Sequence, residues 1–198
     1  MIAASASATP LVSYAHNYGS AFGQVDPGGQ DPLSNNYVTV RDDNPATYQR
    51  FNDHFKFGDL NFSSIDHFEL TIQYAETNDR TLFVFPEHWY LRPGASDDID
   101  LFSLKRVANK TSTTFRIDSS LPQFADMVSN KDFFFWLAED DLFANSFKLY
   151  SAKLEVFGLA AAAVPTAAVP EPTAPALFGL GLAALGLARR RKHGAKGC

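Results

Sequence analysis

The stretch His67-Phe68-Glu69-Leu70-Thr71-Ile72-Gln73-Tyr74 decides the fold class of this chain. Phe68, Leu70, Ile72 and Tyr74 occupy alternate positions, and polar residues fill the positions between them. Because successive side chains of a β-strand point to opposite faces, this period of two predicts a strand with one face in a hydrophobic core and one polar face.

Apolar periodicity of this kind marks further strands on both sides of the first. The run Lys131–Ala138 is almost continuously apolar, which is typical of a strand that is covered on both faces. Only Leu121–Val128 has helical spacing. About seven or eight strands at a spacing of about 10–15 residues predict an all-β protein, an antiparallel β-sandwich or jelly roll. The other predicted strands are Phe51–Phe57, Thr81–Phe85, Ile99–Val107, Thr113–Ile117 and Phe147–Phe157. The turn at Gly58-Asp59 joins the first of these to the strand of His67, and Ile99–Val107 is expected to pair with Thr113–Ile117. In Phe147–Phe157 the side chains of Tyr150, Ala152, Leu154 and Val156 are expected to share a face.

Changes in composition divide the chain into four segments. Residues 1–8 are rich in Ala and Ser, and we interpret them as the end of a secretory signal peptide or as a disordered N-terminus. The β-sandwich domain is expected over 9–157, although the chain up to residue 35 is rich in Gly, Pro and Asn and is expected to be mostly loop. Residues 158–169 form an Ala/Pro linker, and residues 170–198 form a separate C-terminal segment.

The C-terminal segment combines a rigid motif, an apolar run and a basic cluster. Val169 and Pro170-Glu171-Pro172 precede Ala174–Ala188, which contains no charge. As a helix this run would span about 22 Å, which is short for a bilayer core of about 30 Å. The cluster Arg189, Arg190, Arg191 and Lys192 is expected to stay on the cytoplasmic side and to leave the main body outside the cytoplasm. The alternative is a helix docked on the domain, although the run lacks the polar face of a docked helix.

This order of elements resembles the PEP-CTERM sorting signal of Gram-negative bacteria. The matching residues are Pro170-Glu171-Pro172, the apolar run and Arg189-Arg190-Arg191. The resemblance implies recognition by an exosortase, a membrane-embedded transpeptidase-like enzyme, and cleavage near the motif. It also implies that the hydrophobic sorting helix stays in the inner membrane only transiently. The final location would then be the cell surface or the extracellular matrix, where such proteins often accompany polysaccharide or biofilm. The chemistry of the body does not follow from it.

Charge and cysteine content restrict the classes of partner and site. The body through Pro172 holds 12 basic and 22 acidic residues, a net charge of −10 (12 − 22), because five of the 17 basic residues follow Thr173. Such a charge argues against nucleic acid and anionic membrane surfaces as partners. The single cysteine is Cys198, so disulfides, cysteine nucleophiles and thiolate metal sites are excluded from the body.

Catalytic motifs are scarce in this sequence. No H-E-x-x-H pattern, G-x-S-x-G motif or nucleotide-binding glycine loop occurs. His54 and His67 fall on the polar faces of strands expected to be neighbours, where they could approach each other or remain two solvated histidines. We therefore expect a non-catalytic protein. The alternative is a jelly-roll carbohydrate-active enzyme or carbohydrate-binding module, and a carboxylate pair about 5–10 Å apart on a concave face would favour the enzyme.

One aromatic group is a candidate ligand-binding site. Trp89-Tyr90 and Arg92 follow a predicted strand end at Pro86. Exposed aromatic rings beside a guanidinium group can stack on sugar rings. The alternative is that they pack over one end of the sandwich core.

Three carboxylates form a candidate calcium site. Asp97, Asp98 and Asp100 follow the turn residues Pro93-Gly94, and hard oxygen ligands at this spacing can share one calcium ion. The alternative is an acidic solvated turn, which also applies to Glu139-Asp140-Asp141. We expect no other cofactor.

Calcium binding is tested by thermal unfolding. If Asp97, Asp98 and Asp100 form a site, calcium should raise the melting temperature, because it binds the folded state preferentially. Extracellular sites of this kind bind at about 10⁻⁴ to 10⁻³ M, so the titration must reach several millimolar. The double replacement Asp98→Asn and Asp100→Asn should abolish the shift. A shift that survives it would return these residues to an ordinary solvated turn.

Overall fold

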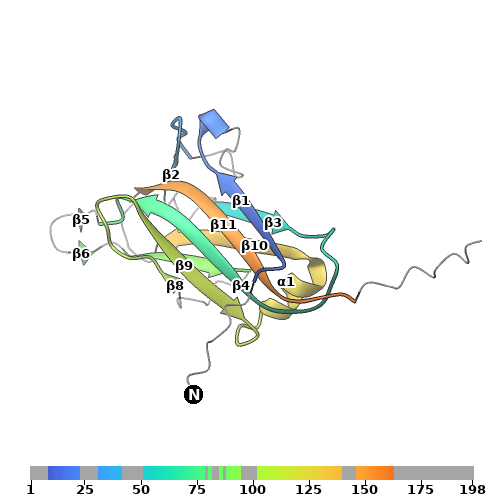
Figure 1. The fold of residues 1–198 in the computed structure, drawn as a ribbon. Helices are drawn as coiled ribbons and strands as arrows, with labels where there is room; N and C mark the ends of the chain where they lie inside the picture. The colour runs from blue at the N-terminus through green and yellow to red at the C-terminus, as the bar shows by residue number, and fades with distance from the viewer. Residues whose placement is uncertain are drawn as a thin grey trace, which may run out of the picture. The chain divides into compact units, whose positions relative to one another are not determined.

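Two antiparallel sheets face each other in the computed structural model, which describes residues 9–22, 31–41, 51–78, 80–81, 85–86, 88–94, 102–139 and 146–162 (Figure 1). The chain divides into two units, Met1–Ala161 and Ala162–Cys198, and the sheets belong to the first. The predicted antiparallel β-sandwich is therefore confirmed.

Within the described residues, the first sheet contains five strands and the second contains four. The first sheet has the spatial order β1 (Val12–Asn17), β11 (Ser146–Ala160), β4 (Phe62–Ala75) and β9 (Thr111–Asp118), and β2 (Val38–Arg41) also pairs with β11. The second sheet has the order β3 (Asn52–Lys56), β10 (Asp132–Glu139), β7 (Trp89–Pro93) and β8 (Phe102–Ser103). A separate hairpin joins β5 (Arg80–Thr81) to β6 (Phe85–Pro86), and the helical elements are the 3₁₀ turn η1 (Ser20–Phe22) and α1 (Phe124–Asn130).

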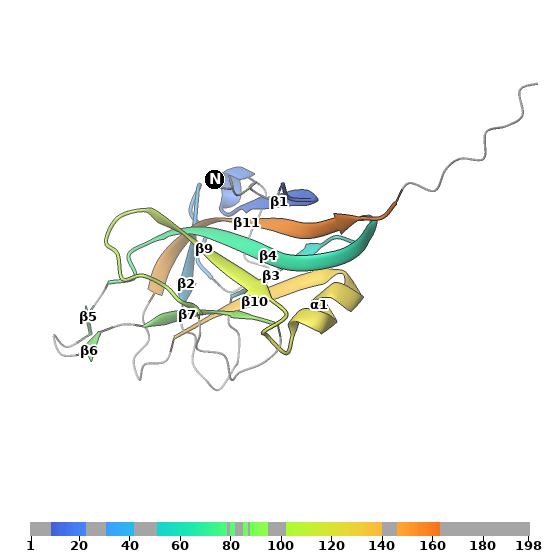
Figure 2. The ribbon, with the colours of Figure 1, turned by 60° about the horizontal axis from the view of Figure 1, so that its bottom comes forward.

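The alternation that predicted the fold forms the core face of β4. Phe68, Leu70, Ile72 and Tyr74 are all inaccessible to solvent. Phe68 meets Phe133 of β10 across the gap between the sheets, with ring centroids 5.1 Å apart in an edge-to-face arrangement. Such pairs stabilise a core beyond the area that they bury. Figure 2 shows the two layers, with β4 and β11 in one and β10 and β7 in the other.

The pairing of strands differs from the prediction at two places. β3 and β4 follow each other in sequence but lie in different sheets, since β3 pairs with β10 and β4 pairs with β11 and β9. Likewise β8 pairs with β7, whereas β9 pairs with β4, so the expected pair of Ile99–Val107 with Thr113–Ile117 is wrong. Alternation identifies a strand but carries no information about which strand it pairs with. The choice of partner depends on the lengths of the strands and on the fit of side chains between the sheets.

A bulge shifts the phase of β11. Phe147 and Leu149 face the core before the bulge, and Ala152, Leu154 and Val156 face it after the bulge. The register with β4 shifts between Leu149 and Ser151. An extra residue in one strand reverses the faces of the residues that follow. The prediction that Tyr150 shares the face of Ala152 is therefore wrong, and Tyr150 packs beside Tyr37, with ring centroids 5.5 Å apart.

Both ends of the sandwich domain contain more strand than expected. β1 lies inside the N-terminal region that was expected to be mostly loop, and it pairs with β11 from Val12 to Asn17. At the other end β11 continues through Gly158 to Ala160, so the first residues of the expected linker belong to the sheet. A strand that already has a partner on one edge can pair with a second strand on its other edge. Here the backbone hydrogen bonds of such pairing override the loop-like composition of the N-terminal region and the linker.

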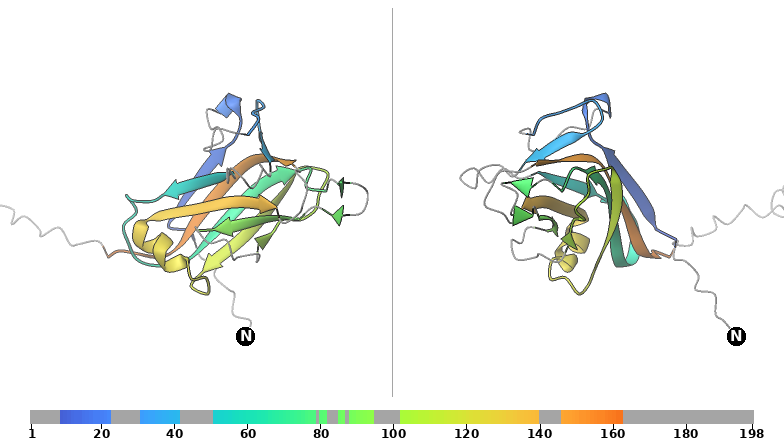
Figure 3. Two further views of the ribbon diagram at one scale, coloured as in Figure 1. Left: turned by 180° about the vertical axis from the view of Figure 1, so that it is seen from behind. Right: turned by 90° about the vertical axis from the view of Figure 1, so that its left-hand side faces the viewer.

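Helix α1 closes one end of the sandwich (Figure 3). The predicted helix spanned Leu121–Val128, and the observed helix begins and ends later in the sequence, at Phe124 and Asn130. Phe124 packs against Phe68, with ring centroids 5.4 Å apart. The helix ends at Lys131, whose backbone is left-handed with φ 52° and whose N–H donates to Met127 and Val128 carbonyl oxygens.

A matched pair of glycine replacements tests the packing of β11 on β4. A Cβ at Gly158 would lie 2.1 Å from the carbonyl oxygen of Ser64, whereas a Cβ at Gly58 would meet nothing within 4 Å. Gly158→Ala should lower the free energy of unfolding by about 1–3 kcal/mol, because backbone must move to relieve the overlap. Gly58→Ala should leave it equal or raise it by up to about 1 kcal/mol, by restricting the unfolded chain. Urea denaturation measures both, and equal effects would contradict the bulged register at Gly158.

Candidate functional site

Three groups of predicted site residues lie outside the described residues. They are the motif Val169 to Pro172, the basic cluster Arg189 to Lys192, and the calcium candidates Asp97, Asp98 and Asp100. Within the ranges that are described, no helix has the length and apolar character needed to cross a membrane. No group of three or more His, Cys, Asp or Glu side chains that could hold a metal ion occurs in those ranges.

The predicted aromatic site at Trp89, Tyr90 and Arg92 is divided between two faces of β7. Trp89 is 1% exposed and points into the core, where its ring meets Phe147 edge-to-face at 4.6 Å. Arg92 is also buried, and its guanidinium carbon lies 4.9 Å from the centroid of the Trp136 ring. Tyr90 is half-buried. Stacking of Trp89 on a sugar is therefore wrong, and Trp89 packs in the core as the alternative stated.

The two histidines considered as a pair belong to different sheets. His54 lies on β3, and its Nδ1 is 3.2 Å from a carboxylate oxygen of Asp132. His67 lies on β4, where its ring stacks on Phe157 at 4.5 Å and its Nδ1 is 2.7 Å from Asp66. Each histidine therefore pairs with a carboxylate near its own strand, and the two do not approach each other. Of the two alternatives, solvation holds for His54, which is exposed, whereas His67 is buried.

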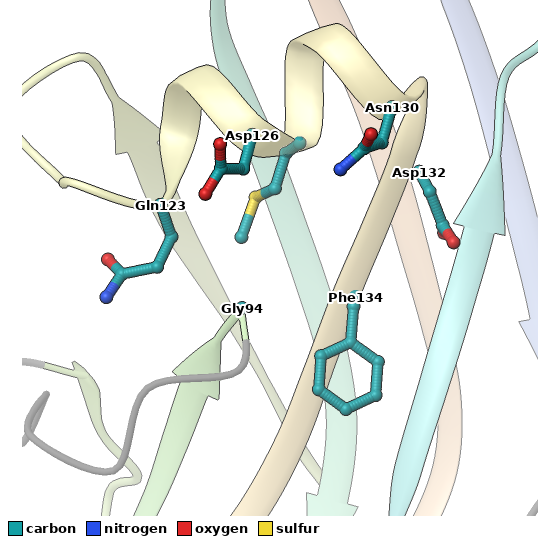
Figure 4. Close-up of a pocket in the computed structure, with 7 residues that line it drawn as sticks. Gly94, Gln123, Asp126, Asn130, Asp132 and Phe134 are labelled. Carbon is teal, nitrogen blue, oxygen red and sulfur yellow. The ribbon is translucent and has the colours of Figure 1, made fainter.

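A pocket of about 600 Å³ lies between α1 and the nearby ends of β7 and β10. Figure 4 shows Asp126 and Asn130 reaching from the helix toward the space beside Gly94, whereas Asp132 points toward the neighbouring strand. The ring of Phe134 forms one wall. The pocket is lined by Gly94, Gln123, Asp126, Met127, Asn130, Asp132 and Phe134.

Local sequence builds this pocket in two ways. Gln123, Asp126 and Asn130 are spaced at i, i+3 and i+7, so they share one stripe of α1. Gly94 has φ +77°, and a Cβ there would lie 2.7 Å from the Gln123 side chain, so only glycine fits the close approach. The polar spacing of Gln123, Asp126 and Asn130 was the signal for this pocket in the sequence. The lining residues from β7 and β10, however, are distant from it in the chain.

A buried polar network links the two sheets. One carboxylate oxygen of Asp53, on β3, accepts a hydrogen bond from the hydroxyl of Tyr18 at 2.6 Å and lies 2.6 Å from Nδ1 of His16 on β1. The other oxygen accepts the N–H of His54 at 2.7 Å. The His16 ring also stacks on Phe55, with centroids 4.3 Å apart. An acid at an inward position between Phe51 and Phe55 was the available signal, and the sequence reasoning missed it.

The network changes the acidity of Tyr18. Burial raises the pKa of the Tyr18 hydroxyl well above its ordinary value of 10.0, and the neighbouring Asp53 charge and hydrogen bond raise it further. A charged tyrosinate in this position would lie beside a carboxylate in a low-dielectric interior. The described geometry of this network therefore stabilises the folded state and joins β1 to β3.

The stabilisation should depend on pH in the alkaline range. Since the folded pKa is raised, the contribution is complete below pH 10 and is lost as the pH rises toward the folded pKa. Above pH 10 the free energy of unfolding should fall by about 1.4 kcal/mol per pH unit from this group. Tyr18→Phe should lower stability at neutral pH and remove that part of the slope, as measured by denaturant titrations from pH 8 to about 11. An unchanged slope in this variant would contradict the assignment.

Comparison with known proteins identifies one feature of the chain. Residues 168–192 match the PEP-CTERM protein-sorting motif. None of the curated protein sequences matches the chain. Among solved structures, the coat protein of Tobacco streak virus is similar over 70% of this chain and 97% of that chain, with 15% identity and a TM-score of 0.30. The chain carries a PEP-CTERM protein-sorting motif at residues 168–192, which marks an exported protein that is processed at the membrane.

Proposed function

We propose that this protein is sorted by an exosortase-type membrane transpeptidase and then acts, without catalysing a reaction, at the cell surface or in the extracellular matrix. The apolar helix would hold the chain in the inner membrane until the enzyme cleaves near Pro170-Glu171-Pro172. The β-sandwich would then be released or transferred outward as the functional part. The observation that carries the proposal is the motif match at residues 168–192.

The order of the tail supports a processed signal. A basic cluster after an apolar run stays on the cytoplasmic side of the membrane, because Lys and Arg resist translocation. The apolar run is short for a permanent anchor, as computed from a rise of about 1.5 Å per residue. A short helix is suited to a transient stay that ends with cleavage.

The pairing of polar groups in the sandwich supports a non-catalytic role. Asp53 bridges Tyr18 and His16 between the sheets. Lys148 lies against Glu76, and its pKa is raised mainly by that hydrogen bond. Hydrogen bonds from Ser120, with a smaller contribution from Arg116, lower the pKa of Asp118. These groups serve the fold or its surface, since each is engaged by neighbouring residues of the sandwich domain.

The alternative of a carbohydrate-active enzyme or a carbohydrate-binding module has one observation in its favour, the pocket beside α1. Glycoside hydrolysis uses two carboxyl groups that flank the scissile bond. In this pocket Asp132 points toward β3, and its carboxylate lies against His54. The pocket therefore favours binding over hydrolysis.

Sorting is tested by the mass of the mature protein from its native host. We expect the mature chain to lack Arg189–Cys198 and to occur outside the inner membrane. Deleting the exosortase should leave the full-length chain in the membrane fraction. A mature protein that still ends at Cys198 and lies in the cytoplasm would overturn the proposal.

Matched variants separate the motif from the neighbouring linker. Simultaneous replacement of Pro170, Glu171 and Pro172 by Ala should block processing, because it removes the rigid motif that the enzyme reads. Pro165→Ala lies outside the matched residues and should be processed like the unmodified chain. Equal processing of both variants would show that cleavage does not depend on the motif.

A further inference from the structure

We propose that the pocket between α1 and β10 binds an uncharged sugar ring. This sugar-binding role goes beyond the sorting proposal, because it concerns only the sandwich and does not depend on cleavage of the tail. The hydrogen-bond acceptors and donors that line the pocket, the ring of Phe134 and the sign of the local charge support it.

Several polar groups that line the pocket are available to hydrogen-bond a ligand. Within the described part of the chain, the side chains of Asp126 and Asn130 make no hydrogen bond or ion pair, and both residues are exposed. The Gln123 side-chain oxygen accepts no hydrogen bond in that part either. Because the terminal torsion of glutamine is soft, this amide can turn to offer its oxygen to a ligand.

Hydroxyl groups match this set of side chains better than other polar groups do. A carboxylate only accepts hydrogen bonds, whereas a carboxamide both donates and accepts. A hydroxyl group also does both, so neighbouring hydroxyls can donate to Asp126 and exchange hydrogen bonds with Asn130 and Gln123. An ammonium group would satisfy Asp126 but would leave the carboxamide N–H groups without an acceptor.

Phe134 supplies the apolar surface that a sugar ring requires. Its side chain is half-buried and stands on the outward face of β10. The His54 ring lies against it at a centroid distance of 4.8 Å, and Nδ1 of His54 lies 3.2 Å from a carboxylate oxygen of Asp132. The Phe134 ring is therefore supported in one orientation, and the C–H face of a pyranose can pack on it.

The charge and polarity of the lining disfavour anions and wholly apolar ligands, and the volume suits a small molecule. Asp126 and Asp132 disfavour an anion, because like charges at short range repel. A wholly apolar ligand would strip water from Asp126 without replacing its hydrogen bonds, which is costly. A volume of about 600 Å³ falls within the range of small-molecule sites, about 300–1,000 Å³. A ring that carries several hydroxyl groups meets all three conditions.

Ligand-observed NMR on the full-length chain tests the proposal. The chain is kept in a detergent without a sugar headgroup, and the probes are methyl β-glucopyranoside, methyl β-galactopyranoside, N-acetylglucosamine, glucuronate and butylammonium. We expect saturation transfer to the ring C–H protons of at least one neutral sugar at or below about 50 mM. Glucuronate should bind at least about fivefold more weakly than the neutral sugar, because of the Asp126 charge.

Three variants locate the binding. Asp126→Asn should weaken binding of the neutral sugar about fivefold, because a hydrogen bond to a neutral amide oxygen is weaker than one to a carboxylate, and should reduce the discrimination against glucuronate. Phe134→Leu keeps an apolar wall but removes the ring, so transfer to the C–H face should be lost. Asp59→Asn changes an exposed acid in the turn before β4 and should have no effect.

The outcomes decide between the proposal and its competitors. If no sugar receives saturation transfer at about 50 mM, the proposal is overturned. Binding that survives both Asp126→Asn and Phe134→Leu would place the sugar elsewhere and would also overturn it. Butylammonium binding more tightly than every neutral sugar would assign the pocket to cations instead. None of these results bears on the processing of the tail, which is measured separately.

Discussion

The pairing of β4 with β11 is the constraint on which the rest of the structure depends. These two strands run antiparallel along most of their lengths, and they place the core faces of Phe68, Leu70 and Ile72 beside Leu154 and Ala152. Every other strand of the first sheet adds to one of them. The bulge near Leu149 lets both halves of β11 face the core, so the strand can also bind β2 and β1 along its other edge.

Aromatic rings transmit this arrangement to the second sheet. Phe133 of β10 meets Phe68, and Trp89 of β7 meets Phe147, so β10 and β7 are held against the first sheet. The carboxylate of Asp53 lies in the same gap, where it costs free energy unless it is paired. Hydrogen bonds from Tyr18 and contact with His16 offset that cost and align β1 with β3.

The pocket is a consequence of how the sandwich closes. Phe124 and Met127 anchor α1 on the end of the core, and the polar stripe of the helix then overhangs the outward face of β10. Gly94 permits the close approach because it carries no side chain. In the proposed function the tail directs the sandwich outward, and in the further proposal the pocket of the sandwich binds a sugar. The two roles reside in separate units of the chain.

The sequence by itself determined the long strands that correspond to β4, β9, β10 and β11, the class of fold and the sorting motif, whereas β1 and β2 lie in segments without such a pattern. Alternation at Phe68 to Tyr74 follows from burial of one strand face, and a motif read as a linear peptide needs no tertiary context. Only the tertiary structure decided which strands pair, where β11 bulges, that Trp89 is a core residue, and that Gln123, Asp126 and Phe134 share a pocket. The pairing of strands and the approach of side chains that are distant in sequence depend on packing between the sheets. Local periodicity in the sequence carries no information about that packing.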